Sequence, residues 1–228
     1  ESNVYVYDGL DNRHWDKDND GSFSHVFITN LETKEKTDLL QDEPYYSPQA
    51  PFGGNEDYIW HPTGKSVVYV SKKKAGTAYA TSTNTDLYEH TLDTKQTKNL
   101  TEKNLGYDTH PTFSPNGDLT WLQMRNDGYE ADKNDIIVRH KGIDINLTAG
   151  WDGTVNSYVW SNDGKKIYFI APVDGTTQLF EVNFPGLTRI AIQVKQLTKG
   201  IFDVASIVGQ INDKILVTRT DFNTASEV

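Results

Sequence analysis

The sequence contains no cysteine among its 228 residues, which excludes disulfides, thiolate zinc sites and cysteine nucleophiles. It also lacks any apolar run close to the roughly 18 residues that a membrane span requires, so we expect no membrane partner. Positive charge is scarce, because 22 Lys and Arg residues face 32 Asp and Glu residues and the net charge is −10. No stripe of Lys and Arg alternates with aromatic residues, so nucleic acid is not an expected partner.

A short phrase occurs three times along the chain. Each copy has an aromatic residue, a polar turn that contains glycine, and then a strand-like apolar run; the copies are Trp60–Lys65, Phe113–Asp118 and Trp160–Lys165. Glycine suits such a turn because it adopts positive φ at no steric cost. A repeat of about 50 residues is longer than a hairpin and indicates a repeated unit of several strands.

Each phrase is followed by a second predicted hairpin that ends in a Leu-Thr pair, at Leu100-Thr101, Leu147-Thr148 and Leu197-Thr198. Four short strands per unit are typical of the blades of a β-propeller. The alternative is a β-sandwich with chance similarity between its hairpins, but sandwich strands seldom repeat a turn in register. We therefore predict an all-β fold, a partial β-propeller of about four to five four-stranded antiparallel blades.

The predicted propeller segment covers residues 1–228 as a single domain. It divides into a partial blade at 1–56, full blades at 57–108, 109–155 and 156–204, and a partial blade at 205–228. The repeated aromatic residues Trp60, Phe113 and Trp160 are expected to pack between neighbouring blades. So few blades close a ring poorly and leave unpaired edge strands, so we expect a piece of a larger propeller that tends to associate.

Three stretches outside the repeat carry a family resemblance. They are Tyr7–Asp16, Ser82–Tyr88 and Met124–Lys133. Together with the turn phrases, which are similar to those of TolB-like propellers, they resemble the propeller of the prolyl oligopeptidase family of serine peptidases. The similarity is greatest to the bacterial dipeptidyl peptidase 5 and acylaminoacyl-peptidase-like branch. Members of that branch usually have an aromatic residue where this chain has Asp18.

The resemblance implies a propeller that gates a C-terminal α/β-hydrolase domain, in a bacterial protein of the periplasm or the secreted fraction. That domain would carry a Gly-x-Ser-x-Gly elbow, and no serine here has glycine at both flanking positions. The chain itself therefore lacks the nucleophile, and the implied substrates are short peptides. Carboxylates would hold the peptide's ammonium group and a guanidinium its carbonyl groups; the candidates are Arg13, Arg125, Tyr129, Glu130 and Asp132. The alternative for Arg125 is a brace within its loop, through Asp127 or Asp132.

One local motif predicts a metal site. Asp16, Asp18 and Asp20 alternate ahead of Gly21 as in the first half of a calcium loop. The bidentate glutamate of such loops is missing, because the twelfth position is Phe27. Calcium binding and a simple acidic turn both remain open.

A second function class also remains open. It is a TolB-like propeller that acts alone as a binding scaffold for a protein or another ligand, with calcium as a possible requirement. A Gly-x-Ser-x-Gly elbow encoded in the same reading frame after Val228 would distinguish the peptidase from the scaffold.

Overall fold

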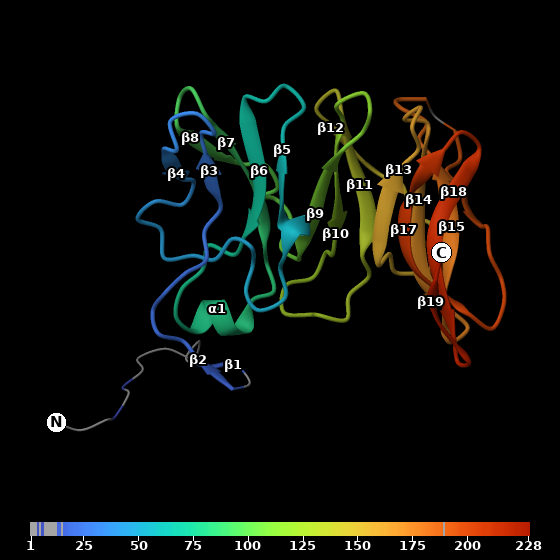
Figure 1. Cartoon of the computed structure of the whole chain (residues 1–228), viewed down its shortest axis with the longest axis horizontal. Helices are drawn as coiled ribbons and strands as arrows, with labels where there is room; N and C mark the ends of the chain where they lie inside the picture. Colours follow the sequence, from blue (N-terminus) through green and yellow to red (C-terminus); the bar gives the residue numbers. More distant parts are fainter. Residues whose placement is uncertain (1–3, 5, 7–12, 15, 189) are drawn as a thin grey trace. The chain divides into compact units, whose positions relative to one another are not determined.

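The computed structural model describes residues 4, 6, 13–14, 16–188 and 190–228. Within these residues the structure is almost entirely antiparallel β-sheet (Figure 1), with one short α-helix, α1 (Thr77–Thr81), and one 3-10 turn, η1 (Asn55–Asp57). No helix in this part of the chain has the length and apolar character to cross a membrane. The described residues form two compact units: the first runs to Pro111 and includes Arg125–Asp132, and the second contains Thr112–Met124 and the residues from Lys133.

The first unit contains two small sheets and one four-stranded sheet. Strand β1 (Arg13–His14) pairs with β2 (Lys17–Asp18), and β3 (Phe27–Thr29) pairs with β4 (Lys36–Asp38). The larger sheet contains, in chain order, β5 (Tyr58–Trp60), β6 (Ser66–Ser71), β7 (Asp86–Thr91) and β8 (Gln96–Asn99).

Two further four-stranded sheets and one three-stranded sheet follow in the same chain order. The first contains β9 (Asp108–Phe113), β10 (Leu119–Gln123), β11 (Asp135–His140) and β12 (Ile143–Asn146); the second contains β13 (Ser157–Trp160), β14 (Lys166–Val173), β15 (Thr176–Asn183) and β16 (Val194–Gln196). The last contains β17 (Asp203–Ile211), β18 (Lys214–Asp221) and β19 (Thr224–Glu227). The predicted four-stranded antiparallel blades are confirmed.

The three glycine turns have the same geometry. Gly64, Gly117 and Gly164 have φ values of 68°, 87° and 66°, a region that disfavours every residue with a Cβ atom. Each glycine N–H donates to the carbonyl three residues earlier, at 2.8–2.9 Å. Each turn joins the first two strands of a four-stranded sheet, so the repeated phrase corresponds to one repeated structural element.

The Leu-Thr pairs close the outer edge of each sheet in the same way. The threonine hydroxyl accepts the N–H of a residue in the third strand, at 3.0 Å from Leu87 to Thr101, 3.0 Å from Ile136 to Thr148 and 2.9 Å from Leu179 to Thr198. These backbone groups are buried or partly buried and would be costly if left unpaired. The repeated Leu-Thr pair therefore corresponds to a hydrogen bond that recurs in each four-stranded sheet.

The core of each unit is built from the apolar runs. All six residues of β6 are buried, and β10, β11 and β14 are mostly buried. In the second unit a cluster forms around Phe169 and Phe180, whose stacked rings lie 5.4 Å apart. Burial of such side chains contributes about 1.5–3 kcal/mol each, which explains why these runs show little alternation of polar and apolar residues.

The aromatic residues before the turns do not share one environment. Trp160 is half-buried and its Nε1 donates to Thr120 Oγ1 at 3.0 Å. Trp60, in contrast, is 51% exposed. Within the residues that the structure describes, Trp60 does not pack between blades, because the described residues before β5 contain no counterparts of β9 and β10, the inner strands that precede β13.

Candidate functional site

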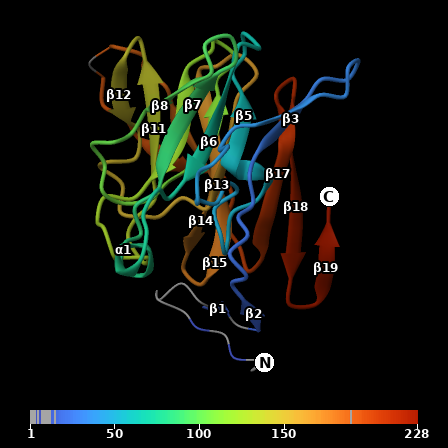
Figure 2. The ribbon, with the colours of Figure 1, turned by 90° about the vertical axis from the view of Figure 1, so that its left-hand side faces the viewer.

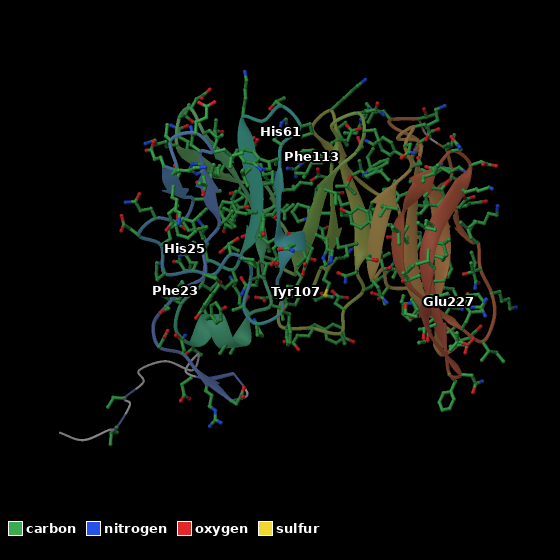
Figure 3. The ribbon with its side chains drawn as sticks, in the orientation of Figure 1. Phe23, His25, His61, Tyr107, Phe113 and Glu227 are labelled. Atoms are coloured by element: carbon green, nitrogen blue, oxygen red, sulfur yellow. The ribbon has the colours of Figure 1, made fainter. Side chains whose placement is uncertain are left out.

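The non-repeating motifs meet in a loop cluster of the first unit. We define this loop cluster as the β4–β5, β6–β7, β8–β9 and β10–β11 loops, with Arg125–Asp132 as the part of the last loop that belongs to the unit. Helix α1 and the β10–β11 loop lie at the lower end of the ribbon in Figure 1, and α1 is again at the lower end in Figure 2. Tyr107, at the end of the β8–β9 loop, is labelled at the same end in Figure 3.

A buried glutamine joins two of these loops. The Nε2 of Gln49 donates to Ala50 O at 2.8 Å and to the Tyr79 hydroxyl at 2.9 Å, while its Oε1 accepts the Lys72 N–H at 2.8 Å. The Nζ of Lys72 donates to the carbonyls of Tyr79 and Ser82, both at 2.9 Å, and lies 4.3 Å from the centre of the Tyr79 ring. A buried amide is stable only with such partners, so Gln49 fixes the β4–β5 loop against α1.

Asp127 connects the β6–β7 loop to the β10–β11 loop. Its Oδ1 accepts the Ser82 hydroxyl at 2.6 Å and the Thr83 N–H at 2.8 Å, and Thr83 Oγ1 accepts the Gly128 N–H at 3.0 Å. The hydrogen bond from Ser82 is the main reason that the pKa of Asp127 lies below its ordinary value. Two of the stretches that carry the family resemblance, Ser82–Tyr88 and Met124–Lys133, are thus in direct contact.

Asp132 braces the β10–β11 loop from within. Its Oδ2 accepts the backbone N–H groups of Arg125 and Asn126 at 3.0 and 2.9 Å and the Asn126 side-chain amide at 2.9 Å. The bracing considered for Arg125 is therefore made by its backbone N–H. Because three donors converge on one oxygen, this carboxylate holds the shape of the loop.

Glu130 is in a different situation from the other two carboxylates of this loop. It is exposed, and among the described residues it has no hydrogen-bond or ion-pair partner. Burial, and next the nearby negative charge of Glu130, raises the pKa of the Tyr107 hydroxyl. Tyr129 beside it is 55% exposed. Glu130 and Tyr129 can therefore meet a ligand in solution, whereas Asp127 and Asp132 are already bonded within the protein.

The β4–β5 loop contains a buried carboxyl group. Asp57 is only 3% exposed, and its Oδ2 accepts the Gln49 N–H at 2.8 Å. Burial raises its pKa from 3.8 to about 6, although the bond from Gln49 acts in the opposite direction. Gly53 lies so close that an added Cβ atom would clash with Asp57 Oδ2. The carboxyl group is thus part of a tightly packed loop and not a group open to ligands.

The predicted calcium residues do not converge. Asp18 Oδ1 lies 4.0 Å from Arg13 Nε, with both side chains mostly exposed, and such pairs contribute little. Asp20 accepts the Ser22 N–H at 2.9 Å, which lowers the pKa of Asp20. In the described part of the chain no three Asp, Glu, His or Cys residues form a group that could hold a metal ion. Calcium binding stays a prediction for titration to decide.

Comparison with known proteins places this geometry in context. No family model matches the chain. It is 35% identical over 222 residues to dipeptidyl-peptidase 5 of Porphyromonas gingivalis, covering 95% of the chain and 31% of that protein. It is 39% identical over 197 residues to dipeptidyl-peptidase 5 of Porphyromonas endodontalis, covering 84% and 28%.

The chain is related to the dipeptidyl-peptidase 5 proteins. The family resemblance inferred from the three motif stretches is thereby confirmed, and the chain spans less than a third of the length of these two relatives. Among solved structures, the β-propeller domain of the Trilobed protease from Pyrococcus furiosus matches with a TM-score of 0.56 at 12% identity, covering 88% of this chain and 53% of that one. That match shows the fold alone: the chain is a segment of a β-propeller.

Residue patterns did not reveal every member of the loop cluster. Gln49, Lys72 and Tyr79 make its contacts. Gln49 and Tyr79 are isolated residues without a motif around them, and the basic run Lys72–Lys74 predicts only a solvated loop. The motif stretches contain Ser82, Thr83 and Asp127, so the family resemblance was the sequence signal for these three residues. Arg13 lies on β1, outside the loops that define the cluster.

Proposed function

We propose that the chain is the non-catalytic, substrate-gating propeller portion of a serine dipeptidyl peptidase that cleaves short peptides. The relationship to dipeptidyl-peptidase 5 over 95% of the chain carries this proposal. The absence of a Gly-x-Ser-x-Gly elbow from the sequence supports the non-catalytic assignment. A C-terminal α/β-hydrolase domain of the same polypeptide would then supply the nucleophile, its histidine and its acid.

Within this function we assign the ammonium group of the peptide to Glu130. A dipeptidyl peptidase must recognise a free amino terminus, and a carboxylate is the side chain that pairs with it. Glu130 is the carboxylate of the β10–β11 loop that the protein does not use itself, while Asp127 and Asp132 hold the loop in position. Arg125 and Tyr129 flank it and would contact the peptide chain, and Arg13 is proposed as a further contact.

The test is steady-state kinetics of the full-length protein on a chromogenic dipeptide substrate. Glu130→Gln removes the charge and keeps the size, and Glu102→Gln, at another exposed glutamate of the loop cluster, is the matched control. Loss of one charged hydrogen bond, about 1.5–3 kcal/mol, lowers kcat/KM by about 10- to 100-fold in Glu130→Gln only. An unchanged kcat/KM removes Glu130 from the site. A full-length protein without dipeptidyl-peptidase activity refutes the proposed function itself.

A further inference from the structure

The last residues of β4, β8 and β12 have the same role in three sheets. Asp38, Asn99 and Asn146 each accept, through Oδ1, the N–H of the residue two positions later, at 2.9 Å in every case. In the sheet that contains β11 and β12, the side-chain amide of Asn146 also donates to Asp135 Oδ2 at 2.8 Å. A carboxylate at the start of one strand therefore meets an amide at the end of the next.

The β3–β4 sheet has the opposite arrangement of side chains at this place. Leu39 and Leu147 donate their N–H groups to equivalent carbonyls, those of the residues that follow His25 and Asp135. His25 thus occupies the position of Asp135, and its Nδ1 lies 2.8 Å from Asp38 Oδ2. An imidazole facing a carboxylate replaces the carboxylate that faces an amide, so this sheet contains a group that titrates near neutral pH.

Both ring nitrogens of His25, which is labelled in Figure 3, face oxygen acceptors. Nδ1 faces the Asp38 carboxylate, and Nε2 lies 3.1 Å from the carbonyl oxygen of Glu43. A neutral imidazole has one N–H and one lone pair, whereas an imidazolium has two N–H donors. The His25 side chain is only 13% exposed, so water compensates poorly for a lost contact. Both contacts are therefore made only when the ring carries two protons.

The contact with Glu43 attaches the β4–β5 loop to the β3–β4 sheet. Glu43 lies in this loop, and further along it the Ser47 N–H donates to Ser24 O at 2.8 Å, in the segment next to His25. The same loop contributes Gln49 to the loop cluster. The state of the His25 ring therefore bears on the order of one of the four loops that form the cluster.

The other charged groups near this pair have partners of their own. The carboxylate of Glu43 forms an ion pair with Lys73 of the β6–β7 loop. Tyr69 of β6 faces both acids, because burial and then the charge of Glu43, with a smaller effect of Asp38, raises the pKa of its hydroxyl. Asp38 is thus the carboxylate that directly balances a charge on His25.

We propose that His25 is a pH-responsive latch that holds the β4–β5 loop against the β3–β4 sheet while its ring carries two protons. The charge of a histidine ordinarily changes between about pH 5 and pH 8. Once the ring loses a proton, it can donate to Asp38 or to Glu43 but not to both. The contribution of the latch is therefore present at low pH and is lost as pH rises. This proposal is independent of the peptidase function.

The test combines two NMR measurements on the chain between pH 5 and pH 8. Long-range 1H–15N spectra report the protons on the His25 ring, and hydrogen exchange reports the protection of the Glu43 and Ser47 amides. All proteins carry Asp57→Asn, because Asp57 lies in the same loop and its pKa of about 6 would give an effect of the same sign. We expect two ring protons at pH 5 and protection that falls about tenfold by pH 8, together with the ring titration.

Histidine variants assign the effect to one residue. His25→Gln should show protection that does not change with pH, whereas His61→Gln, in the turn between β5 and β6, should keep the tenfold change. Burial lowers the pKa of His90 and of His110, so their titration would increase protection as pH rises. Protection that is constant in the parent protein, or a tenfold change that persists in His25→Gln, overturns the proposal.

A second variant covers the case in which His25→Gln does not fold. His25→Asp with Asp38→Asn reproduces the pair that Asp135 and Asn146 form in another sheet. Its protection at Ser47 should not depend on pH between 5 and 8, because neither new side chain titrates as histidine does. A tenfold change that persists in this double variant overturns the proposal as well.

Discussion

The buried carboxyl of Asp57 makes the stability of the first unit depend on pH. Asp57 is 3% exposed and its pKa is raised from 3.8 to about 6 by burial. The folded unit therefore holds the proton up to about pH 6, whereas the unfolded chain releases it near pH 3.8. Because the folded state binds more protons in this interval, its stability falls as pH rises.

The difference between these two values corresponds to roughly 3 kcal/mol. This contribution is fully present below pH 3.8 and is lost as pH rises through about 6. Asp57→Asn is neutral at every pH and keeps a side-chain oxygen to accept the Gln49 N–H. The variant should match wild type near pH 4 and be more stable by about 3 kcal/mol at pH 7 to 8.

Urea denaturation between pH 4 and pH 8 gives the free energy of unfolding of both proteins. Hydrogen exchange of the β6 amides reports the first unit specifically, which matters because the two units need not unfold together. Asp213→Asn, in the exposed turn between β17 and β18, is the control for a general loss of charge. Curves for wild type and Asp57→Asn that stay parallel from pH 4 to pH 8 would refute the reasoning.

Three further predictions concern the loop cluster, the hydrogen bond made by the threonine of each Leu-Thr pair, and the candidate calcium residues. Asp127→Ala should accelerate hydrogen exchange at Thr83 and Gly128 by about tenfold or more, since it removes the acceptor of Ser82 and Thr83, while Asp127→Asn should have a smaller effect. Thr148→Val should destabilise the second unit by about 2–4 kcal/mol in urea denaturation, because Ile136 N–H and Asp135 lose a buried partner, and Thr148→Ser should restore most of this. If Asp16, Asp18 and Asp20 bind calcium, millimolar Ca²⁺ should raise Tm in wild type and not in Asp20→Asn, and an unchanged wild-type Tm retires the metal site.

Most of the fold was predictable because its signals are local and repeated. Gly64, Gly117 and Gly164 must adopt positive φ for the chain to turn, and a residue with that constraint is visible in one sequence. Thr101, Thr148 and Thr198 likewise mark a hydrogen bond made once per blade. Repetition of these constraints about every 50 residues predicted four-stranded blades without any knowledge of long-range contacts.

The exceptions arise where a residue's environment is supplied by distant parts of the chain. Trp60 and Trp160 both follow a tyrosine at two residues' distance and precede a glycine turn, yet among the described contacts it is Trp160 whose N–H donates to a threonine of another sheet. The roles of Asp127 and Asp132 were equally hidden, because an acidic residue in a loop has the same appearance whether it binds a ligand or a backbone N–H. The sequence named the β10–β11 loop as a candidate site but did not show which of its carboxylates accept hydrogen bonds within the protein.

The loop cluster explains how a repetitive scaffold can present a precise site. Ser82 is held through its carbonyl by Lys72 and through its hydroxyl by Asp127, so the contacts run from Gln49 to Asp127 across three loops. Loops that only connect strands would fluctuate independently and order a ligand at high entropic cost. Asp127 and Asp132 fix the backbone around Glu130 before any peptide binds. The entropic cost of ordering the loop is therefore met during folding. The internal carboxylates are therefore as necessary to the proposed recognition as the exposed one, and replacing either should weaken peptide binding without touching the peptide.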